Sequence, residues 1–335
     1  MQSASIEARL KSFHQRRLGR GLSSVSPIVS AKYGVFNVSS FLDKIIDLAD
    51  RPSSFWGVDR CLRIEESVDP FHSRIFHLAA FVRSIESHGQ THDRWHNEQF
   101  ARLREDTLKQ LLSLFAWFQV DRHRLQATYF GGLKVGGYPD RLDRMLKRSY
   151  RLPEDDVSAR VLRQHEIKAT PVATVVNLRI LQIAPGSRSL VGMAVEFHLD
   201  DIEVATGFFG CYRVKNGLLQ AVNYVAGYGI GIERLTSALA GKDFLEVVPR
   251  YKRARSIIER RSKAARLPIM ARDVREVLFG LETLAHLSPE QNCRNTVLIN
   301  RMKGQIKESI HNLGLSFDDV KQIHRAFAGL DPRSI

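Results

Sequence analysis

The sequence predicts an α+β fold in which a mainly antiparallel sheet with flanking helices precedes an all-helical domain. Runs of β-forming residues follow one another between residues 170 and 229, and the turn signals APGS, DD and KNG separate them. From residue 232 onward every strongly patterned segment is helical. The length of 335 residues is enough for one large domain or two medium ones. We therefore expect a sheet domain over residues 1–240 and a helical domain over residues 241–335.

The first element is predicted to be a helix. Ile6, Leu10 and Phe13 recur at helical spacing, and the pattern stops near Gly19. The basic, amphipathic start is also typical of a transit peptide. The acidic Glu7 and the short apolar content favour an ordinary helix instead.

Extended segments and one long helix follow. The pattern predicts a strand around residues 58–66, a strand or short helix over 74–83, and a strand over 125–130 that two glycines end. Apolar residues recur with a period near 3.6 from residue 94 to 118, which predicts an amphipathic helix whose apolar side is core. A short helix is expected over residues 140–150.

The rest of the chain divides into strands and then helices. The predicted strands occupy residues 170–184, 190–199, 204–214 and 218–229. The predicted helices occupy residues 232–240, 249–267, 271–287, 294–314 and 317–330.

The chain carries an excess of positive charge. Lys and Arg number 50 against 36 Asp and Glu, which leaves a net charge of +14. Residues 241–335 hold 18 basic and 11 acidic residues, so this part carries half of the excess. The excess predicts a polyanionic partner such as RNA, DNA or a nucleotide, and a basic surface with no ligand is the alternative. With 44% hydrophobic and 26% charged residues, the composition excludes disordered and fibrous proteins.

Cysteine usage and apolar runs bear on the compartment. Cys61, Cys211 and Cys293 are scattered and form no C-x-x-C pair, so we expect neither a disulfide framework nor a zinc ribbon. This usage favours a reducing cytosol and therefore a cytoplasmic location. No run approaches the roughly 18 apolar residues that cross a bilayer, so no membrane partner is expected.

Three histidines at helical spacing form a weaker pattern. His88, His92 and His96 stand at i, i+4 and i+8, which would align three imidazoles that could bind zinc or nickel. Gly89 and the polar run around it favour an exposed helix start instead. No nucleophile motif supports Ser-His-Asp catalysis.

The most specific string is GYGIGIERL at residues 227–235. Its three alternating glycines let a strand backbone lie against a flat ligand, and Arg234 in the following helix would then meet a phosphate. Close packing of a glycine-rich turn into a helix is the alternative.

This string resembles motif 3 of class II aminoacyl-tRNA synthetases, and the alanyl-tRNA synthetase branch in particular. Other segments resemble that branch in the same order: RCLR at 60–63 and FHSRIFHLAAF at 71–81 are similar to motif 2, and RLQATYFGG, LPEDDV and VEFHLD to later segments. DVREVLFGLETL and PEQNCRNTVLINR resemble the helical tRNA-recognition domain. The resemblance covers nearly the whole chain and implies a class II synthetase-like fold.

The resemblance also implies site residues. Arg63 would grip the α-phosphate and the amino-acid carboxylate, and Arg234 would flank the triphosphate, so both are the expected catalytic residues. The ATP site would further include His77, Gly229 and Gly231.

Glu196 and Asp200 would hold Mg²⁺ at the bound ATP, because Mg²⁺ prefers one or two carboxylates together with phosphate oxygens. A salt bridge at the edge of the sheet is the alternative for Glu196.

The candidate amino-acid pocket departs from the family pattern. Gly227 stands where alanyl-tRNA synthetases have an aspartate that pairs with the substrate ammonium, and Ala205 and Thr206 replace a tryptophan and an asparagine. Phe71 and His77 replace an arginine and a glutamate of motif 2. We therefore expect a larger, altered pocket whose substrate need not be alanine.

The helical part is the expected RNA-binding region. No segment resembles the family's editing or C-terminal oligomerising domain, so proofreading in cis is not expected. Phosphate contacts are expected, with a solvated helix face as the alternative, at the basic and polar residues Lys252, Arg253, Arg255, Arg260, Arg261, Lys263, Arg266, Asn292 and Arg294.

The leading hypothesis is ATP-dependent activation of an amino acid, or a similar acid, as an adenylate and its transfer to an acceptor, with tRNA favoured. One alternative is a ligase that loads a carrier protein or a small molecule. Another is a non-catalytic paralogue that binds tRNA or a synthetase, which Phe71, His77 and Gly227 favour. Both a monomer and a homodimer are consistent with the sequence.

Overall fold

The structure is a computed structural model that describes residues 3–18, 41–62, 75–87, 94–135, 145–147, 149–173, 177–182, 188–286 and 296–328. Its helices are α1 (Ser3–Leu18), α2 (Phe41–Asp47), α3 (Glu98–Trp117), α5 (Asp156–Gln164), α6 (Ile232–Ala240), α7 (Phe244–Val247), α8 (Pro249–Ala264), α9 (Ala271–His286), α11 (Thr296–Asn312) and α12 (Phe317–Ala328). Its strands are β1 (Ser54–Leu62), β2 (Ile75–Ile85), β3 (Leu125–Phe130), β4 (Leu133–Val135), β5 (Tyr150–Leu152), β6 (Lys168–Val172), β7 (Leu178–Gln182), β8 (Ser189–Leu199), β9 (Ile202–Lys215) and β10 (Leu218–Gly231). The chain is therefore α+β, as the sequence predicts.

One large sheet organises the N-terminal part. Its strand order is β1-β2-β10-β9-β8-β3-β6, and β7 pairs with β8 beside β3. Neighbouring strands are antiparallel except β3 and β6, which run parallel. The strands β4 and β5 form a small separate sheet.

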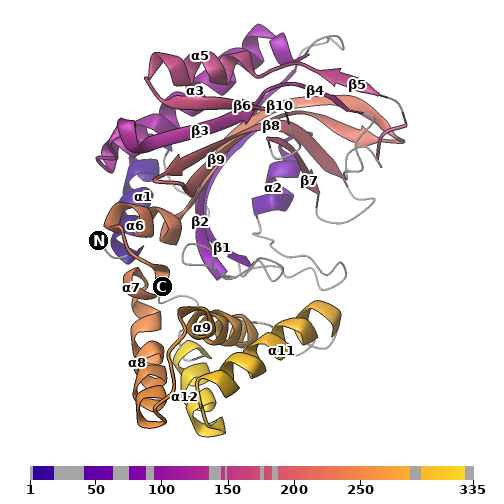
Figure 1. Ribbon diagram of the computed structural model, residues 1–335. Helices are drawn as coiled ribbons and strands as arrows, with labels where there is room; N and C mark the ends of the chain where they lie inside the picture. The colour runs from indigo at the N-terminus through magenta and orange to yellow at the C-terminus, as the bar shows by residue number, and fades with distance from the viewer. Residues whose placement is uncertain are drawn as a thin grey trace.

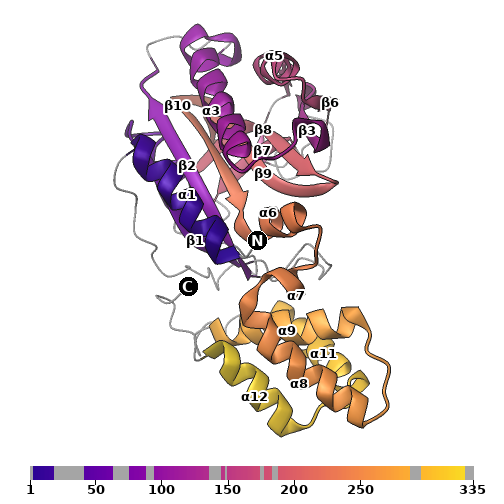
Figure 2. The same ribbon diagram turned by 90° about the vertical axis from the view of Figure 1, so that its left-hand side faces the viewer.

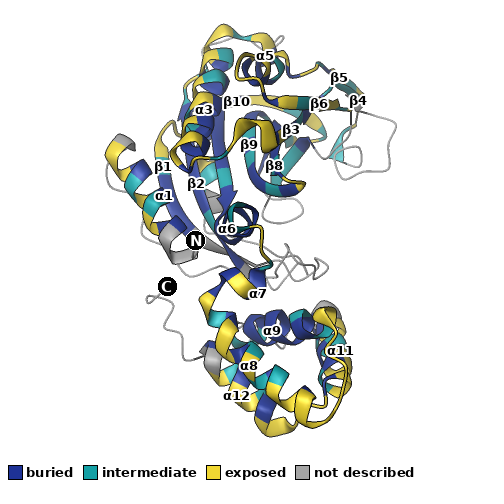
Figure 3. Cartoon of the chain, turned by 60° about the vertical axis from the view of Figure 1, so that its left-hand side comes forward, coloured by how far each residue is buried: buried dark blue, intermediate teal, exposed yellow. Residues whose placement is uncertain are grey.

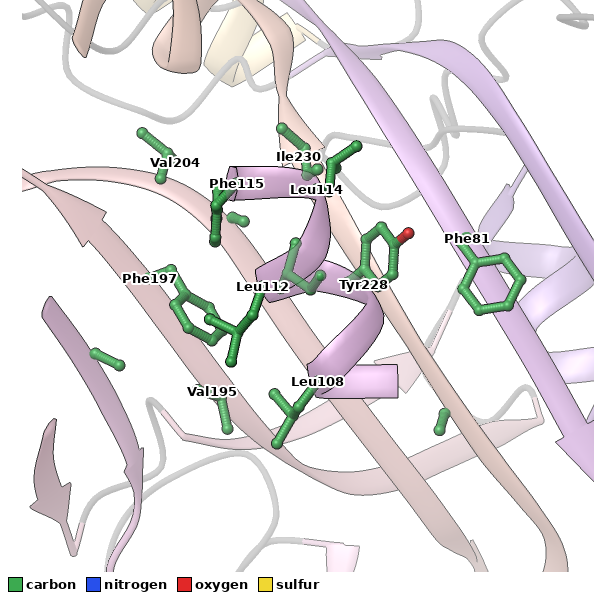
Figure 4. Close-up of a cluster of buried hydrophobic side chains, with 14 of the residues drawn as sticks. Phe81, Leu108, Leu112, Leu114, Phe115, Val195, Phe197, Val204, Tyr228 and Ile230 are labelled. Carbon is green, nitrogen blue, oxygen red and sulfur yellow. The ribbon is translucent and has the colours of Figure 1, made fainter. Parts of the chain in front are cut away.

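Helices cover both faces of this sheet. Figure 1 shows α3 and α5 on one side of the sheet and α2 on the other. On the α3 side, alternate strand residues meet the helix, because successive side chains of a strand point to opposite faces. Leu108, Leu112 and Phe115 of α3 lie over Val195 and Phe197 of the sheet (Figure 4), and the rings of Phe115 and Phe197 have centroids 5.6 Å apart.

The first helix packs beside the first two strands of the sheet (Figure 2). Ile6, Leu10 and Phe13 are buried, as their helical spacing predicts. His14 of the same helix stacks on Trp56 of β1 with ring centroids 5.4 Å apart, and its Nε2 lies 3.0 Å from the hydroxyl of Tyr228. These contacts hold α1 against β1, β2 and β10.

The C-terminal helices have a hydrophobic core of their own. Buried side chains of α7, α8, α9, α11 and α12 form one cluster that runs from Phe244 to Phe327. The main cluster of the sheet region ends with Ala238, so the two clusters separate within residues 239–243. Figure 3 shows buried residues on the inner sides of these helices and exposed residues on their outer sides. The helix α7 was not predicted from the sequence.

The element boundaries refine several predictions. The segment 74–83 is a strand, β2, and the predicted single strand 170–184 is two strands, β6 and β7. The helix α5 was not predicted; it begins after Asp155, whose carboxylate caps it at Ser158 and forms a buried ion pair with Arg104. The short helix expected over 140–150 lies mostly outside the described residues.

Within the described part of the chain, every helix is too short or too polar to cross a membrane.

Candidate functional site

One row of residues crosses the sheet on the face that α2 covers. Strand register places six residues side by side across six strands, in the order Gly57, Ala80, Gly229, Thr206, Glu196 and Thr128. The flanking positions Phe81 and Tyr228 point to the opposite face, into the α3 core. The first three members of the row have at most a methyl group, so this half of the face is flat, and the other half is polar.

Two glycines of the GYGIGIERL string serve different contacts. A Cβ on Gly227 would lie 2.5 Å from the carbonyl oxygen of Phe81, so the close approach of β10 and β2 requires glycine there. A Cβ on Gly229 would meet only the end of the Leu78 side chain, at 3.0 Å. Packing against β2 therefore explains why residue 227 is glycine, at the position where the family resemblance implies a pocket aspartate.

The third glycine, Gly231, makes room for Arg234. Gly231 is the N-cap residue of α6, and a Cβ there would lie 3.3 Å from Cδ of Arg234. The stem of Arg234 thus folds back over the end of β10. Its guanidinium carbon lies 5.2 Å from the ring centroid of Phe76, and only 4% of the residue is exposed.

Glu203 links Arg234 to the row. Its Oε2 accepts a hydrogen bond from Nη1 of Arg234 at 2.7 Å, and its Oε1 accepts one from the hydroxyl of Thr206 at 2.8 Å. A buried guanidinium needs an acceptor of opposite charge, and Glu203 provides it. The arginine is therefore held in one orientation beside Gly229 and Thr206.

The two expected magnesium ligands are not brought together. Glu196 lies in the row and forms an ion pair with Arg179 of β7. Asp200 lies in the exposed turn after β8 and forms an ion pair with Arg124, which lowers the pKa of Asp200 mainly through its hydrogen bonds. Among the described residues no three His, Cys, Asp or Glu side chains gather as a metal site. These two carboxylates do not fit a shared Mg²⁺ site, and the ion pair of Glu196 is the alternative that the sequence left open.

His77 lies with Glu233 rather than with the row. The backbone N–H of His77 donates to Oε2 of Glu233 at 2.8 Å, and Nδ1 of its ring lies 2.7 Å from Oε1. Burial alone would raise the pKa of Glu233, but His77 and Arg250 outweigh it and hold that pKa at about 2. Phe76 and Leu78, on either side of His77, face Arg234 and Gly229. The histidine therefore supports the strand from its other face.

The remaining expected residues have separate positions. Ala205 is buried in the α3 core, so Thr206 alone of that pair lies on the row. Arg63, which the resemblance makes a catalytic residue, lies outside the described residues. So do five further residues named in the sequence analysis: Phe71, His88, His92, Asn292 and Arg294.

The basic residues of α8 separate into two groups. Lys252, Arg253, Arg260 and Lys263 are exposed and fall within about 100° of arc around the helix. Arg255 forms an ion pair with Glu259 on the same helix, and Arg261 forms one with Asp319 of α12. Arg266 is exposed in the turn after α8.

Sequence reasoning missed the partners of these residues. Glu203, Phe76 and Arg179 contact the site only because β9, β2 and β7 lie beside β10 or β8, and no local spacing encodes such pairs. Glu233 was visible beside Arg234 in the motif, but its contact with His77 was not.

Comparisons with known proteins add a likeness in structure but none in sequence. No protein-family model matches the chain, and no curated protein matches it in sequence. Among solved structures, the chain is similar to asparaginyl-tRNA synthetase of Entamoeba histolytica in complex with asparaginyl-adenylate, with a TM-score of 0.39 and 11% identity. The match covers 73% of this chain and 64% of that enzyme.

Proposed function

We propose that the protein activates an amino acid, or a similar carboxylic acid, with ATP to form an acyl-adenylate. In this proposal residues 1–240 form the adenylating domain and residues 241–335 a helical domain that meets the acceptor. The chain would then be a ligase of the class II aminoacyl-tRNA synthetase type, whose alanyl branch its motifs resemble. ATP is a substrate; pyrophosphate leaves when the adenylate forms, and AMP leaves when the acyl group is transferred to the acceptor.

The observation that carries the proposal is the placement of Arg234. The guanidinium comes from the first turn of a helix, beside the small residues Gly229 and Gly231 at the end of β10, and Glu203 fixes its direction. A helix N-terminus and a fixed arginine next to a flat surface suit a nucleotide, since the phosphates meet the positive group and the base lies on the flat part. Arg234, Gly229 and Gly231 all belong to the GYGIGIERL string, which supports the proposal.

The reaction needs two anions held together. A carboxylate oxygen of the acid attacks the α-phosphorus of ATP, the bond from that phosphorus to the bridging oxygen breaks, and pyrophosphate leaves. Catalysis of such a displacement is mostly positioning and charge stabilisation. Arg234 would stabilise the negative charge at the phosphate, and Arg63 would share that role on the evidence of the motif alone. Glu196 and Asp200 are paired with different arginines and do not share a site, so no step is assigned to Mg²⁺ there.

The polar half of the row is the proposed site for the acid. Thr206 lies next to Gly229 in the register, and Glu196 lies next to Thr206. Arg179 forms an ion pair with Glu196, and Glu203 accepts a hydrogen bond from Thr206. A carboxylate such as Glu196 suits the ammonium group of an amino acid. This part of the site supports an amino acid over a plain acid as substrate.

The proposed acceptor is tRNA. Lys252, Arg253, Arg260 and Lys263 present one cationic face without an ion pair between the described residues, which suits an RNA backbone. A ligase that loads a carrier protein or small molecule remains the second candidate, because the amino-acid pocket differs from the family pattern at Ala205 and Thr206. A non-catalytic tRNA-binding paralogue is the third.

ATP–pyrophosphate exchange tests the proposal. The wild-type chain is assayed against the twenty protein amino acids and several non-protein ones, with Arg234→Ala as the inactive variant. Arg275→Ala, which removes a partly buried arginine paired with Asp243 and not with a residue of the row, is the matched control for loss of an arginine. Exchange with one substrate that only Arg234→Ala abolishes supports the proposal. RNA binding with no exchange for any acid would favour the paralogue instead.

A further inference from the structure

A buried ionic network joins the sheet region to the C-terminal helices. It contains His77 of β2, Glu233 of α6, Arg250 and Tyr251 of α8, and Glu282 of α9. Glu233 and Tyr251 are fully buried, and the other members are nearly so. The network lies where the two hydrophobic clusters separate, so it crosses the junction between them.

Arg250 is the centre of this network. Its Nε donates to Oε1 of Glu282 at 2.6 Å, and its Nη1 and Nη2 lie 3.4 Å from Oε1 of Glu233. Tyr251 donates its hydroxyl proton to the other oxygen of Glu282. Burial opposes the charge of Arg250, but Glu282 and Glu233 outweigh it and raise its pKa. One guanidinium thus connects a carboxylate from each side of the junction.

On the sheet side, the carboxylate of Glu233 contacts His77. Both carboxylate oxygens contact that residue, one at the backbone N–H and one at the ring. The neighbours of His77 along β2 are Phe76, which lies under the guanidinium of Arg234, and Leu78, which pairs with Gly231. A displacement of His77 would therefore move two residues that contact the candidate ATP site.

These contacts form a continuous path from the helical part to Arg234. The path runs from Glu282 through Arg250 and Glu233 to His77. From His77 it continues to its two neighbours on β2, Phe76 and Leu78. Glu233 and Arg234 are also consecutive in the first turn of α6, so the same stretch of backbone carries both side chains. A guanidinium fork fixes two carboxylates more rigidly than an ammonium group does.

We propose that Arg250 is a positioning residue: through Glu233 it fixes His77 and the start of α6, so that the docked helical domain completes the ATP side of the site. The inference rests on the proposed function. It assigns His77 a role through β2 and not a contact with ATP. It also makes the C-terminal helices necessary for adenylation, independently of any acceptor they bind.

The matched control is a second arginine at the same junction. Arg275 of α9 forms an ion pair with Asp243, the N-cap residue of α7, with Nη2 to Oδ2 at 2.5 Å. This pair also ties α9 to the segment after α6, but it contacts neither Glu233 nor His77 among the described residues. Arg250→Lys and Arg275→Lys both keep the charge and remove the fork.

The experiment uses the full chain labelled with ¹⁵N-histidine, with Glu233→Gln to identify the signals of His77. We expect Arg250→Lys to shift the His77 signals, to speed hydrogen exchange of its backbone N–H about tenfold, and to raise the Kd for ATP about fivefold. Arg275→Lys should change none of these three quantities, even where it lowers Tm as much as Arg250→Lys does.

Two results would overturn the inference. Unchanged His77 signals in a folded Arg250→Lys variant would remove the path itself. Shifted signals with unchanged ATP affinity would leave Arg250 a structural residue only. Failure of the proposed function has a different signature, because the wild-type chain would then bind no ATP while the His77 signals still respond to Arg250→Lys.

Discussion

Gly231 contacts the side chain of Arg234, and the lack of a side chain on Gly231 makes room for that contact. A Cβ on Gly231 would lie 3.3 Å from Cδ of Arg234, which is tighter than ordinary packing, and 3.4 and 3.5 Å from its Cβ and Cγ, which is ordinary contact. The glycine therefore sets where the guanidinium lies, three residues along the chain. The glycine-rich string and the position of the Arg234 guanidinium are therefore linked.

The first prediction concerns this contact. Gly231→Ala should displace Arg234 and lower the rate of ATP–pyrophosphate exchange about 10-fold to 100-fold, since small misplacements of a positioning group are costly. Its backbone φ of −74° suits alanine, so the free energy of unfolding should fall by only about 1 kcal/mol.

Gly304→Ala is the matched control for that substitution. Gly304 lies in α11, and nothing lies within 4 Å of the position of its Cβ. This variant should keep full exchange activity and gain about 1 kcal/mol of stability from helix propensity. Equal activity in the two alanine variants would contradict the assigned role of Gly231.

The second prediction separates the other two glycines. Gly227→Ala should lower the free energy of unfolding by about 3 kcal/mol, because its Cβ would clash with the backbone of β2. Gly229→Ala meets only the flexible end of Leu78, so it should cost much less stability and should instead raise the KM for ATP. Denaturant unfolding and exchange kinetics on both variants check this. A stable Gly227→Ala variant would show that packing does not account for that glycine.

The third prediction follows from the depressed pKa of Glu233, about 2 in the folded chain. The ordinary value is near 4.3, so the stabilisation by this carboxylate is complete above that pH and is lost as the pH falls toward 2. The stability difference between the wild-type chain and Glu233→Gln should therefore shrink by about 2 kcal/mol from pH 5 to pH 3. Urea unfolding of both chains at several pH values measures it. A difference that stays constant with pH would mean that Glu233 is not ionised through its contacts with His77 and Arg250.

The fourth prediction concerns the cationic face of α8. Arg253 and Arg260 are exposed and two turns apart, whereas Arg255 and Arg261 are held by Glu259 and Asp319. The double variant Arg253→Ala/Arg260→Ala should reduce the slope of log affinity for tRNA against log salt by about 1.5. The double variant Arg255→Ala/Arg261→Ala should reduce it by less than about 0.5. Equal slopes for the two double variants would show that this face of α8 does not contact RNA.

The sequence predicted the elements better than it predicted their contacts. The helices α1 and α3 and the strands β8, β9 and β10 follow from periodicity and turn signals, which are local properties. The helix α7 was missed because four residues give too little periodicity to detect, and α5 was missed as well.

The candidate site shows the same division. Arg234 and its glycines were visible as one string, but Glu203 and Phe76 reach Arg234 from other strands of the sheet. The two expected metal ligands, Glu196 and Asp200, have the spacing of the family segment. Their ion pairs depend on Arg179 and Arg124, which only the pairing of strands brings near. Spacing along a chain does not determine which side chains meet across a sheet.

Direct detection of an acyl-adenylate tests the central claim. The wild-type chain is incubated with ATP and a mixture of amino acids, and the bound small molecules are analysed by mass spectrometry, with Arg234→Ala in parallel. The account predicts one acyl-adenylate on the wild-type chain and none on Arg234→Ala. Bound ATP with no adenylate for any amino acid on the wild-type chain would contradict it.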